Sequence, residues 1–260
     1  MLLTVFILAL LGSVVGGFAS VVTWRLPRGK SVVWPSNHCH TCRDKIVLYD
    51  NIPWTGWLRL NGKCRHCQDK IPIRYPLIEF ISSLIWITMS VFIWNQDSYN
   101  YIHIIGSIIL SFLLLCIAII DIEHMHIPEG MCIFGIISGI VITGLNYLTY
   151  GQEDLYSMIN NHFLAVFGAL VTMESISLVG KKIVGTEILG LGDAKLAAMG
   201  AAWLGMYGLT VAMTLAIMSA GMFSFVGRVT KYLKPLQPFP FAPFIALGIW
   251  SSWIYFGIRF

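Results

Sequence analysis

The stretch Gly190-Leu191-Gly192-Asp193 places a carboxylate directly after two glycines and beside a long apolar sequence. A second carboxylate, Asp121, closes another apolar run, residues 102–120. A charged side chain at the centre of a bilayer costs at least ~2.5 kcal/mol, so an acid at membrane depth is a candidate functional group. Two aspartates at similar depth therefore indicate a membrane aspartic protease.

The composition of the whole chain is that of a membrane protein. Of its 260 residues, 57% are hydrophobic and only 12% are charged, which excludes an ordinary soluble domain. We therefore expect an all-α polytopic membrane protein whose partners include membrane lipids and no nucleic acid.

The apolar runs predict the number of membrane spans, because a spanning helix needs about 20 apolar residues. The clear candidates are 2–23, 77–94, 102–120, 131–149, 162–180 and 241–258. The stretch 194–226 is long for one span and is interrupted by Gly205-Met206-Tyr207-Gly208. We predict a tight hairpin of two short, tilted helices there, which gives about eight transmembrane helices.

The distribution of basic residues predicts the orientation, because cytoplasmic loops carry the excess of Lys and Arg. Ten of the 17 Lys and Arg residues lie between Arg25 and Arg74, and none lies between Tyr75 and Gly180. The region 24–76 is therefore expected in the cytoplasm. Counting spans from there places Asp121 and Asp193 at the same, cytoplasmic face of the membrane.

Two carboxylates at one face have a defined chemistry. A close pair cannot easily ionise twice, so it shares one proton. The ionised acid takes a proton from water, and the protonated acid donates one to the scissile carbonyl or its leaving group. The alternative is that each aspartate is only a helix cap or an interfacial residue. Glu174 lies deeper in a span, and the sequence suggests no role for it.

The cysteines of the polar region form two CxxC pairs. Cys39 and Cys42 are separated from Cys64 and Cys67 by 21 residues, a spacing typical of a structural zinc site with four thiolate ligands. A cytoplasmic region of about 50 residues has a small core, so a stabilising metal is physically sensible. Four cysteines complete a tetrahedral site, so His38, His40 and His66 are expected to be bystanders. The alternative is a redox-active dithiol pair.

Several segments together resemble the bifunctional type IV prepilin leader peptidase and N-methyltransferase family of bacteria. Residues 16–27, GGFASVVTWRLP, are similar to the family's G-S-F-x-N-V-V-x-x-R-L-P. The two CxxC pairs follow, with Asn51-Ile52-Pro53 between them. Residues 62–67, GKCRHC, and 74–79, RYPLIE, resemble its G-K-C-R-x-C and R-Y-P-x-V-E.

The two acid motifs resemble the same family. Asp121 followed six residues later by Ile127-Pro128 is similar to D-x5-[IL]-P-D, and residues 187–196, EILGLGDAKL, are similar to E-x-x-G-x-G-D-x-K-L. GxGD also resembles presenilin-type proteases, but the cysteine region and the first acid motif favour the prepilin family. The chain departs from the pattern at three positions, where Gly17, Ser20 and Glu129 replace the usual Ser, Asn and Asp. Glu123 is a further nearby acid, but only Asp121 has the motif's spacing to Ile127-Pro128.

The resemblance implies a substrate and two activities. The substrate would be a prepilin or pseudopilin, with a short basic leader, a Gly before the cut and then an apolar helix. The catalytic pair would be Asp121 and Asp193 at the cytoplasmic face of the bacterial inner membrane. The new N-terminal residue would then be methylated with S-adenosylmethionine, whose site the family places around four residues: Gly62, Lys63, Tyr75 and Glu79.

These expectations divide the chain into three parts. Residues 1–23 would be the first transmembrane helix, 24–76 a cytoplasmic zinc-binding and methyl-transferring region, and 77–260 the transmembrane peptidase. Two other classes stay open from the residues alone: a membrane thiol oxidoreductase that uses the CxxC pairs, and a carrier whose acids relay protons. The sequence does not give the oligomeric state or say which prepilins are processed.

Overall fold

The computed structural model of the chain describes residues 2–94, 100–150, 155–184, 190–234 and 237–256. The chain divides into two compact units, Met1–Asn95 and Gln96–Phe260. Two predicted features lie outside the described residues: Glu187 of the second acid motif and the end of the last span, 257–258.

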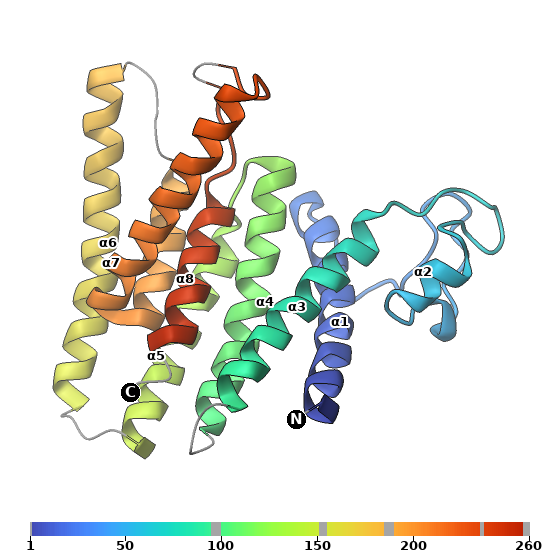
Figure 1. Ribbon diagram of the computed structural model, residues 1–260, viewed down its shortest axis with the longest axis horizontal. Coiled ribbons are helices and arrows are strands. Elements are labelled where there is room, and N and C mark those ends of the chain that lie inside the picture. The colour runs from blue at the N-terminus through green and yellow to red at the C-terminus, as the bar shows by residue number, and fades with distance from the viewer. Residues whose placement is uncertain (1, 95–99, 151–154, 185–189, 235–236, 257–260) are drawn as a thin grey trace. The chain divides into compact units, whose positions relative to one another are not determined.

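Helices account for both units, and the described residues contain no β-strand, which confirms the predicted all-α class (Figure 1). The first unit holds α1 (Leu2–Arg25), α2 (Thr55–Arg59) and α3 (Arg74–Trp94). The second unit holds α4 (Tyr101–His124), α5 (Glu129–Tyr150), α6 (Leu155–Val184), α7 (Leu191–Val229) and α8 (Ala242–Phe256).

In the first unit α1 packs directly on α3 through small residues of α1. A side chain at Gly12 would meet the Trp86 ring at 2.8 Å, and one at Gly16 would meet the Glu79 Cα at 2.7 Å. Ser82 Oγ donates a hydrogen bond of 2.6 Å to the Gly12 carbonyl. Glycines four residues apart let two apolar helices approach closely, and hydroxyl groups then bond across the contact.

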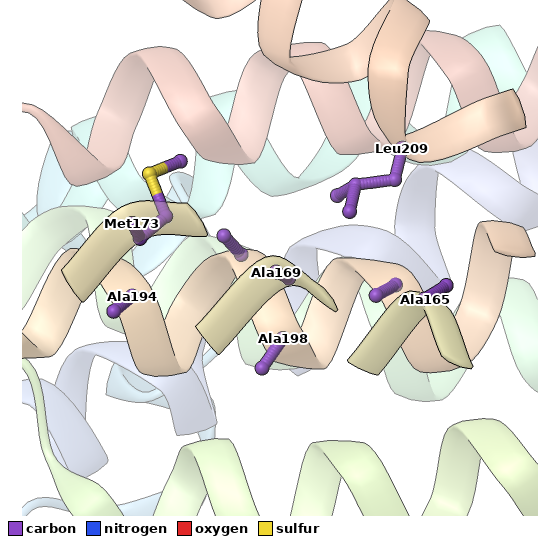
Figure 2. Packing of buried hydrophobic residues seen from close by; sticks show 8 residues of the cluster. Ala165, Ala169, Met173, Ala194, Ala198 and Leu209 are labelled. Carbon is purple, nitrogen blue, oxygen red and sulfur yellow. The ribbon is translucent and has the colours of Figure 1, made fainter. Parts of the chain in front are cut away.

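The second unit is a bundle in which α7 packs against α5, α6 and α8. Its contact with α6 is lined with alanines, as Figure 2 shows. Ala165 and Ala169 of α6 face Ala194 and Ala198 of α7. Small side chains bring the two helices close together, which fixes the start of α7, where Asp193 lies.

The predicted interruption of the 194–226 stretch is present at Gly205. This residue has φ 64° and ψ −171°, which divides α7 into helical segments 191–204 and 206–229. Leu209 then packs back onto the cluster that contains Ala198 and Ala201, so the chain reverses at the glycine. A positive φ is a conformation that glycine adopts at little cost, which explains why the break falls there. With α7 counted as two segments and the five-residue α2 set aside, the described residues contain eight helical segments at the predicted places.

Five described helices are long and apolar enough to cross a membrane: Leu2–Arg28, Tyr101–His124, Glu129–Thr149, Met158–Lys182 and Leu191–Val229. The chain is therefore a multi-pass membrane protein. Two of the predicted spans are not among these five: 77–94, which lies within α3, and 241–258, whose described part is the shorter apolar helix α8.

Candidate active site and metal centre

Asp121 lies one turn before the end of α4 and is 6% exposed. Its Oδ2 accepts a hydrogen bond of 3.0 Å from the backbone N–H of Ala242, the first residue of α8. The N–H of the preceding residue, Phe241, acts on the same carboxylate. The carboxylate is thus held at the positive end of another helix, where unpaired N–H groups favour an anion.

Asp193 is a half-buried residue in the first turn of α7. Its Oδ2 accepts a hydrogen bond of 3.2 Å from the N–H of Gly190, the residue that caps this helix. Gly192 is needed immediately before it, because a side chain there would meet Ile127 Cβ at 3.0 Å. The glycine of the second acid motif therefore gives room for the isoleucine of the first.

The two acid motifs lie at the same end of the second unit. Besides the contact between Gly192 and Ile127, Lys195 Nζ forms an ion pair with the carboxylate of Glu129. The sequence predicted that the two acids share a face from the count of spans alone, and these two contacts are consistent with that prediction.

Sequence reasoning missed the segment 239–244, which supplies the amides that hold Asp121. Phe239 and Phe244 pack with Phe223 of α7 at ring-centre distances of 5.4–6.0 Å, which fixes this segment to the bundle. The three prolines 238, 240 and 243 mark it as extended chain that ends in a helix start, since proline is favoured in the first turn. That pattern was the available signal.

Both aspartates serve as caps, as the alternative expectation from the sequence proposed. Capping does not exclude chemistry here, because each carboxylate has a second oxygen that can take another partner. The arrangement brings two acids, three backbone amides and one lysine to a single end of the bundle.

The four cysteines of the polar region meet at one point in the first unit. The Sγ atoms of Cys39 and Cys67 are 3.7 Å apart, those of Cys42 and Cys64 are 3.9 Å apart, and all four lie within 4.8 Å of one another. Tetrahedral zinc with Zn–S bonds of about 2.3 Å requires sulfur separations of about 3.8 Å. The site therefore fits a zinc ion, and no histidine belongs to the group. All six cysteines are free thiols, and no disulfide joins any of these residues, which the structure describes in full.

The two CxxC pairs form equivalent turns, which explains how they present their thiols to one centre. Cys39 O accepts the N–H of Arg43, and Cys64 O accepts the N–H of Gln68, each residue having φ near +60°. The backbone N–H of Cys42 is the main cause that lowers the pKa of the Cys39 thiol to about 7, whereas burial and hydrogen bonds from neighbouring thiols raise the pKa of Cys42 and Cys67.

Polar interactions between the two turns stabilise the metal centre. Thr41 of the first turn donates a hydrogen bond to the carboxylate of Asp69 beyond the second. Arg65 donates two hydrogen bonds of 2.8 and 2.7 Å to the carboxylate of Asp50. This guanidinium holds the pKa of the Asp50 carboxyl below its usual range. A bidentate arginine–carboxylate pair fixes orientation as well as distance.

A cavity of ≈ 740 Å³ lies between the metal centre and α1 and α3. Its wall includes the aromatic residues Phe18, Trp24, Trp54, Trp57 and Tyr75. The cavity is large enough for a ligand of several hundred daltons, and aromatic walls with a few polar groups are typical of small-molecule sites.

Of the four residues expected to bind the methyl donor, two line the cavity and two do not. Tyr75 and Glu79 line the cavity, and the Glu79 carboxylate accepts the backbone N–H of Trp54 at 2.9 Å. Gly62 and Lys63 do not line it. Gly62 has φ +67° and lies against the Trp57 ring, so its place in the fold is that of a tight turn.

The histidines near the cysteines contribute to the cavity wall. His40 Nε2 is 3.1 Å from the Tyr75 hydroxyl, and its ring packs against Trp24 with the ring centres 4.3 Å apart and the planes tilted by 34°. Burial, together with nearby positive charges that include Lys30 and Arg25, lowers the pKa of His40. In the second unit Glu174 is exposed on α6.

The fold and the two sites define a class: a multi-pass helical membrane protein with two acids at one end of its bundle and a four-cysteine centre after its first helix. Residues 10–93 match the family described as "Bacterial Peptidase A24 N-terminal domain", and residues 108–225 match the "Type IV leader peptidase family". No solved structure matches the chain.

Characterised relatives agree with these matches. A "Prepilin leader peptidase/N-methyltransferase" of Neisseria gonorrhoeae is 31% identical over 95% of this chain and 88% of its own length. The enzyme of that name from Myxococcus xanthus is 32% identical over 76% of this chain and 55% of its own length. A "Type 4 prepilin-like proteins leader peptide-processing enzyme" of Escherichia coli is 28% identical over 91% of this chain and 88% of its own length. The chain belongs to the type IV leader peptidase family, which confirms the resemblance seen in its motifs.

Proposed function

We propose that this protein removes the leader from prepilin or pseudopilin substrates and that Asp121 and Asp193 perform the cleavage. The observation that supports this most directly is the meeting of the two acid motifs at one end of the bundle, through the contact of Gly192 with Ile127 and the ion pair of Lys195 with Glu129. The names of the relatives support the substrate class and the two activities.

The cleavage step needs two acids in different protonation states. One carboxylate takes a proton from a water molecule as its oxygen attacks the scissile carbonyl carbon. The other donates a proton toward the carbonyl oxygen or the leaving amine, so no covalent intermediate with the enzyme forms. The amides of Phe241 and Ala242 hold Asp121 in a fixed orientation for this step, and Gly190 does the same for Asp193.

The position of the acids at a helix-bundle end suits a substrate that is itself a membrane helix. A prepilin would lie in the bilayer with its apolar segment beside the bundle and its basic leader in the cytoplasm. The peptide bond after the glycine would then reach the aspartates at the inner face of the bacterial cytoplasmic membrane. The excess of basic residues in the region 24–76 supports this orientation.

We further propose that the first unit methylates the new N-terminal residue, with S-adenosylmethionine bound in the ≈ 740 Å³ cavity. When bound there, S-adenosylmethionine supplies an electrophilic methyl group. Tyr75 and Glu79 would contact the ligand or the incoming amine, and the aromatic residues would cover its adenine ring. Gly62 and Lys63 would act from the neighbouring turn, by shaping the segment that carries Cys64.

The metal of the four-cysteine centre is proposed to be zinc with a structural role. The sulfur separations and the completeness of the four-thiolate set support zinc, and a closed site leaves no coordination position for chemistry. In functional terms we propose residues 1–23 as an anchoring helix, 24–76 as the zinc-binding and methyl-transferring region, and 77–260 as the peptidase. The structural units place α3 with the first helix, so the functional border at residue 76 needs its own test.

One assay tests both activities. The purified full-length protein is mixed with a prepilin and S-adenosylmethionine, and the masses of the products are measured. We expect loss of the leader and the gain of one methyl group on the mature protein. No cleavage of several different prepilins would overturn the peptidase proposal, and cleavage without any methyl gain would overturn the methyl-transfer proposal alone.

A further inference from the structure

The end of α1 carries a buried arginine that the cysteine centre and the aspartates do not use. Arg25 is 7% exposed and lies in the wall of the ≈ 740 Å³ cavity. Its Nη1 donates to the carbonyls of Ser31 and Val32 at 3.2 Å each. Among the residues that the structure describes, no carboxylate forms an ion pair with it.

A buried guanidinium without an acidic partner is costly, so its surroundings indicate a missing anion. The first acidic residue in the chain is Asp44, whereas Arg25, Arg28 and Lys30 all lie within six consecutive positions, 25–30. Arg28 and Lys30 both lie over the Trp24 ring, 4.7 Å from its centre, and neither lines the cavity. Arg25 alone of the three basic residues faces the ligand space.

The other cations around the cavity do not offer the same site. Arg65 is taken up by its two hydrogen bonds to Asp50, and Lys45 and Lys70 are exposed. A buried arginine is a better carboxylate receptor than a surface lysine, because its planar group can form two parallel hydrogen bonds and is held in place before the ligand arrives.

The cavity also has an acidic group, Glu79 of α3. Glu79 Oε1 would lie 3.5 Å from a side chain at Gly17, eight positions before Arg25 in α1, or about 12 Å along a helix that rises 1.5 Å per residue. The cavity wall thus includes a carboxylate from α3, aromatic rings and the Arg25 guanidinium at the end of α1.

The Arg25 guanidinium suits the carboxylate of a ligand whose ring can lie against the aromatic part of this wall. We infer that Arg25 binds the amino-acid carboxylate of S-adenosylmethionine and so sets the direction in which the methyl donor lies in the cavity. The inference rests on the proposed methyl-transfer function. Arg25 is thereby a binding residue for the donor and has no contact with the peptide bond that is cut.

The test compares two ligands that differ only in this carboxylate. Binding of S-adenosylmethionine and of decarboxylated S-adenosylmethionine to the full-length, zinc-loaded protein in neutral detergent is measured by titration calorimetry. For the wild type we expect the carboxylate to strengthen binding about tenfold or more, the effect of a charge-assisted pair. The variant Arg25→Gln should lose that difference and keep its affinity for the decarboxylated ligand. The matched control Arg28→Gln should bind both as the wild type does.

Each result decides something. If Arg25→Gln weakens both ligands equally, or neither, the inference is wrong although the donor site stands. If the wild type binds neither ligand, the proposed donor site itself is wrong, and the inference falls with it. Should Arg25→Gln lose its zinc or its fold, Arg25→Lys replaces it, and a selective loss of affinity for the carboxylate-bearing ligand is again expected.

A lipid phosphate is the other anion that this position could meet at a membrane surface. The titrations are therefore repeated in nanodiscs that contain phosphatidylglycerol. The inference expects the selectivity for the carboxylate to persist there. Loss of the selectivity in these nanodiscs only, together with lipid retention that depends on Arg25, would assign the arginine to the lipid and overturn the inference.

Discussion

The loop region 26–73 and the second helical unit each hold a group of functional side chains in place, but by different interactions. The loop region has short helices only, and its geometry depends on four thiols and a few polar pairs such as Arg65 with Asp50. The second unit fixes its acids with backbone amides at helix starts and with alanine-lined helix contacts. The difference teaches that the metal serves the part with little core, whereas the part in the membrane relies on packing.

This contrast leads to predictions that separate the two regions. Removing a group in one region should affect the chemistry or stability of that region and spare the other. The effects should be greatest for the acids themselves, smaller for the metal and the glycines, and smallest for the polar pair at the surface.

The largest effect is expected at the acids. Asp121→Asn and Asp193→Asn should each lower the rate of prepilin cleavage by about 10³-fold or more, since each acid has a proton-transfer role that an amide cannot fill. The rate is measured by gel or mass analysis of the purified variants. Glu123→Gln, a change in the neighbouring acid, is the matched control and should cleave nearly as the wild type does. Normal cleavage by either asparagine variant would remove that residue from the proposed pair.

The metal centre should matter next. Replacing Cys39 with Ser, or removing zinc with a chelator, should unfold the loop region and reduce methyl transfer by more than tenfold, because a structural zinc contributes folding free energy directly. Cleavage should change much less. Metal analysis and both activities are measured together. Cys132→Ala, which changes a buried thiol of the second unit, should keep its zinc; equal zinc loss in both variants would contradict the assignment of the four thiols.

The contact between α1 and α3 can be tested at two adjacent glycines. Gly16→Ala should destabilise the first unit by about 1–3 kcal/mol, because the added carbon would lie 2.7 Å from the Glu79 Cα and force backbone movement. Gly17→Ala is the matched control, since its added carbon would lie 3.5 Å from a side-chain oxygen only. Thermal unfolding in detergent measures both. Equal stability of the two variants would mean that the helices are not packed through Gly16.

The break in α7 can be tested in the same way, with one glycine variant at the break and a control variant elsewhere in the helix. Gly205→Ala should destabilise the second unit by about 1–2 kcal/mol, because alanine disfavours a φ of 64°. Gly221→Ala has open space around it and should be neutral or slightly stabilising, as alanine is the better helix former. Unfolding measurements on both variants provide the comparison. A stabilising effect at 205 would argue for one continuous helix.

The smallest effect concerns Asp50, whose pKa Arg65 lowers. A carboxyl with a lowered pKa in the folded state stabilises that state fully above the unfolded pKa and loses this contribution as pH falls below it. Asp50→Asn should therefore lower the unfolding temperature of the loop region by a constant amount between pH 6 and 8, and the difference should shrink below about pH 4. A difference that grows on acidification would have the wrong sign for this ion pair.

Much of the fold could be predicted because its causes are local. Apolar runs, the spacing of four cysteines and a glycine pair inside one long run are all visible in the sequence, and the structure contains the corresponding helices, the thiol cluster and the break at Gly205. The hydrogen bond from Ala242 to Asp121 could not be predicted in the same way. Its partners are 121 residues apart, and the donor is a backbone amide that any residue except proline carries.

The cavity was equally hidden from the sequence. Its wall combines α1, two loops and α3, so that Tyr75 and Glu79 face it whereas Gly62, only two residues before a metal ligand, does not. Two of the three positions where the chain departs from the family pattern, Gly17 and Ser20, line this cavity. These two residues lie in one cavity wall only because α1 packs on α3, and this contact is not visible in the sequence.

The central claim is that Asp121 and Asp193 cleave the prepilin and that the first unit methylates the new N-terminal residue. The two reactions would use separate sets of residues. The most direct measurement gives the Asp193→Asn variant a synthetic mature pilin peptide with a free N-terminal amine, together with S-adenosylmethionine, and determines the product mass. The account predicts that this peptide gains one methyl group at a rate near that of the wild type, although the same variant leaves the precursor uncut. Loss of methylation in a correctly folded, zinc-loaded Asp193→Asn protein would contradict it.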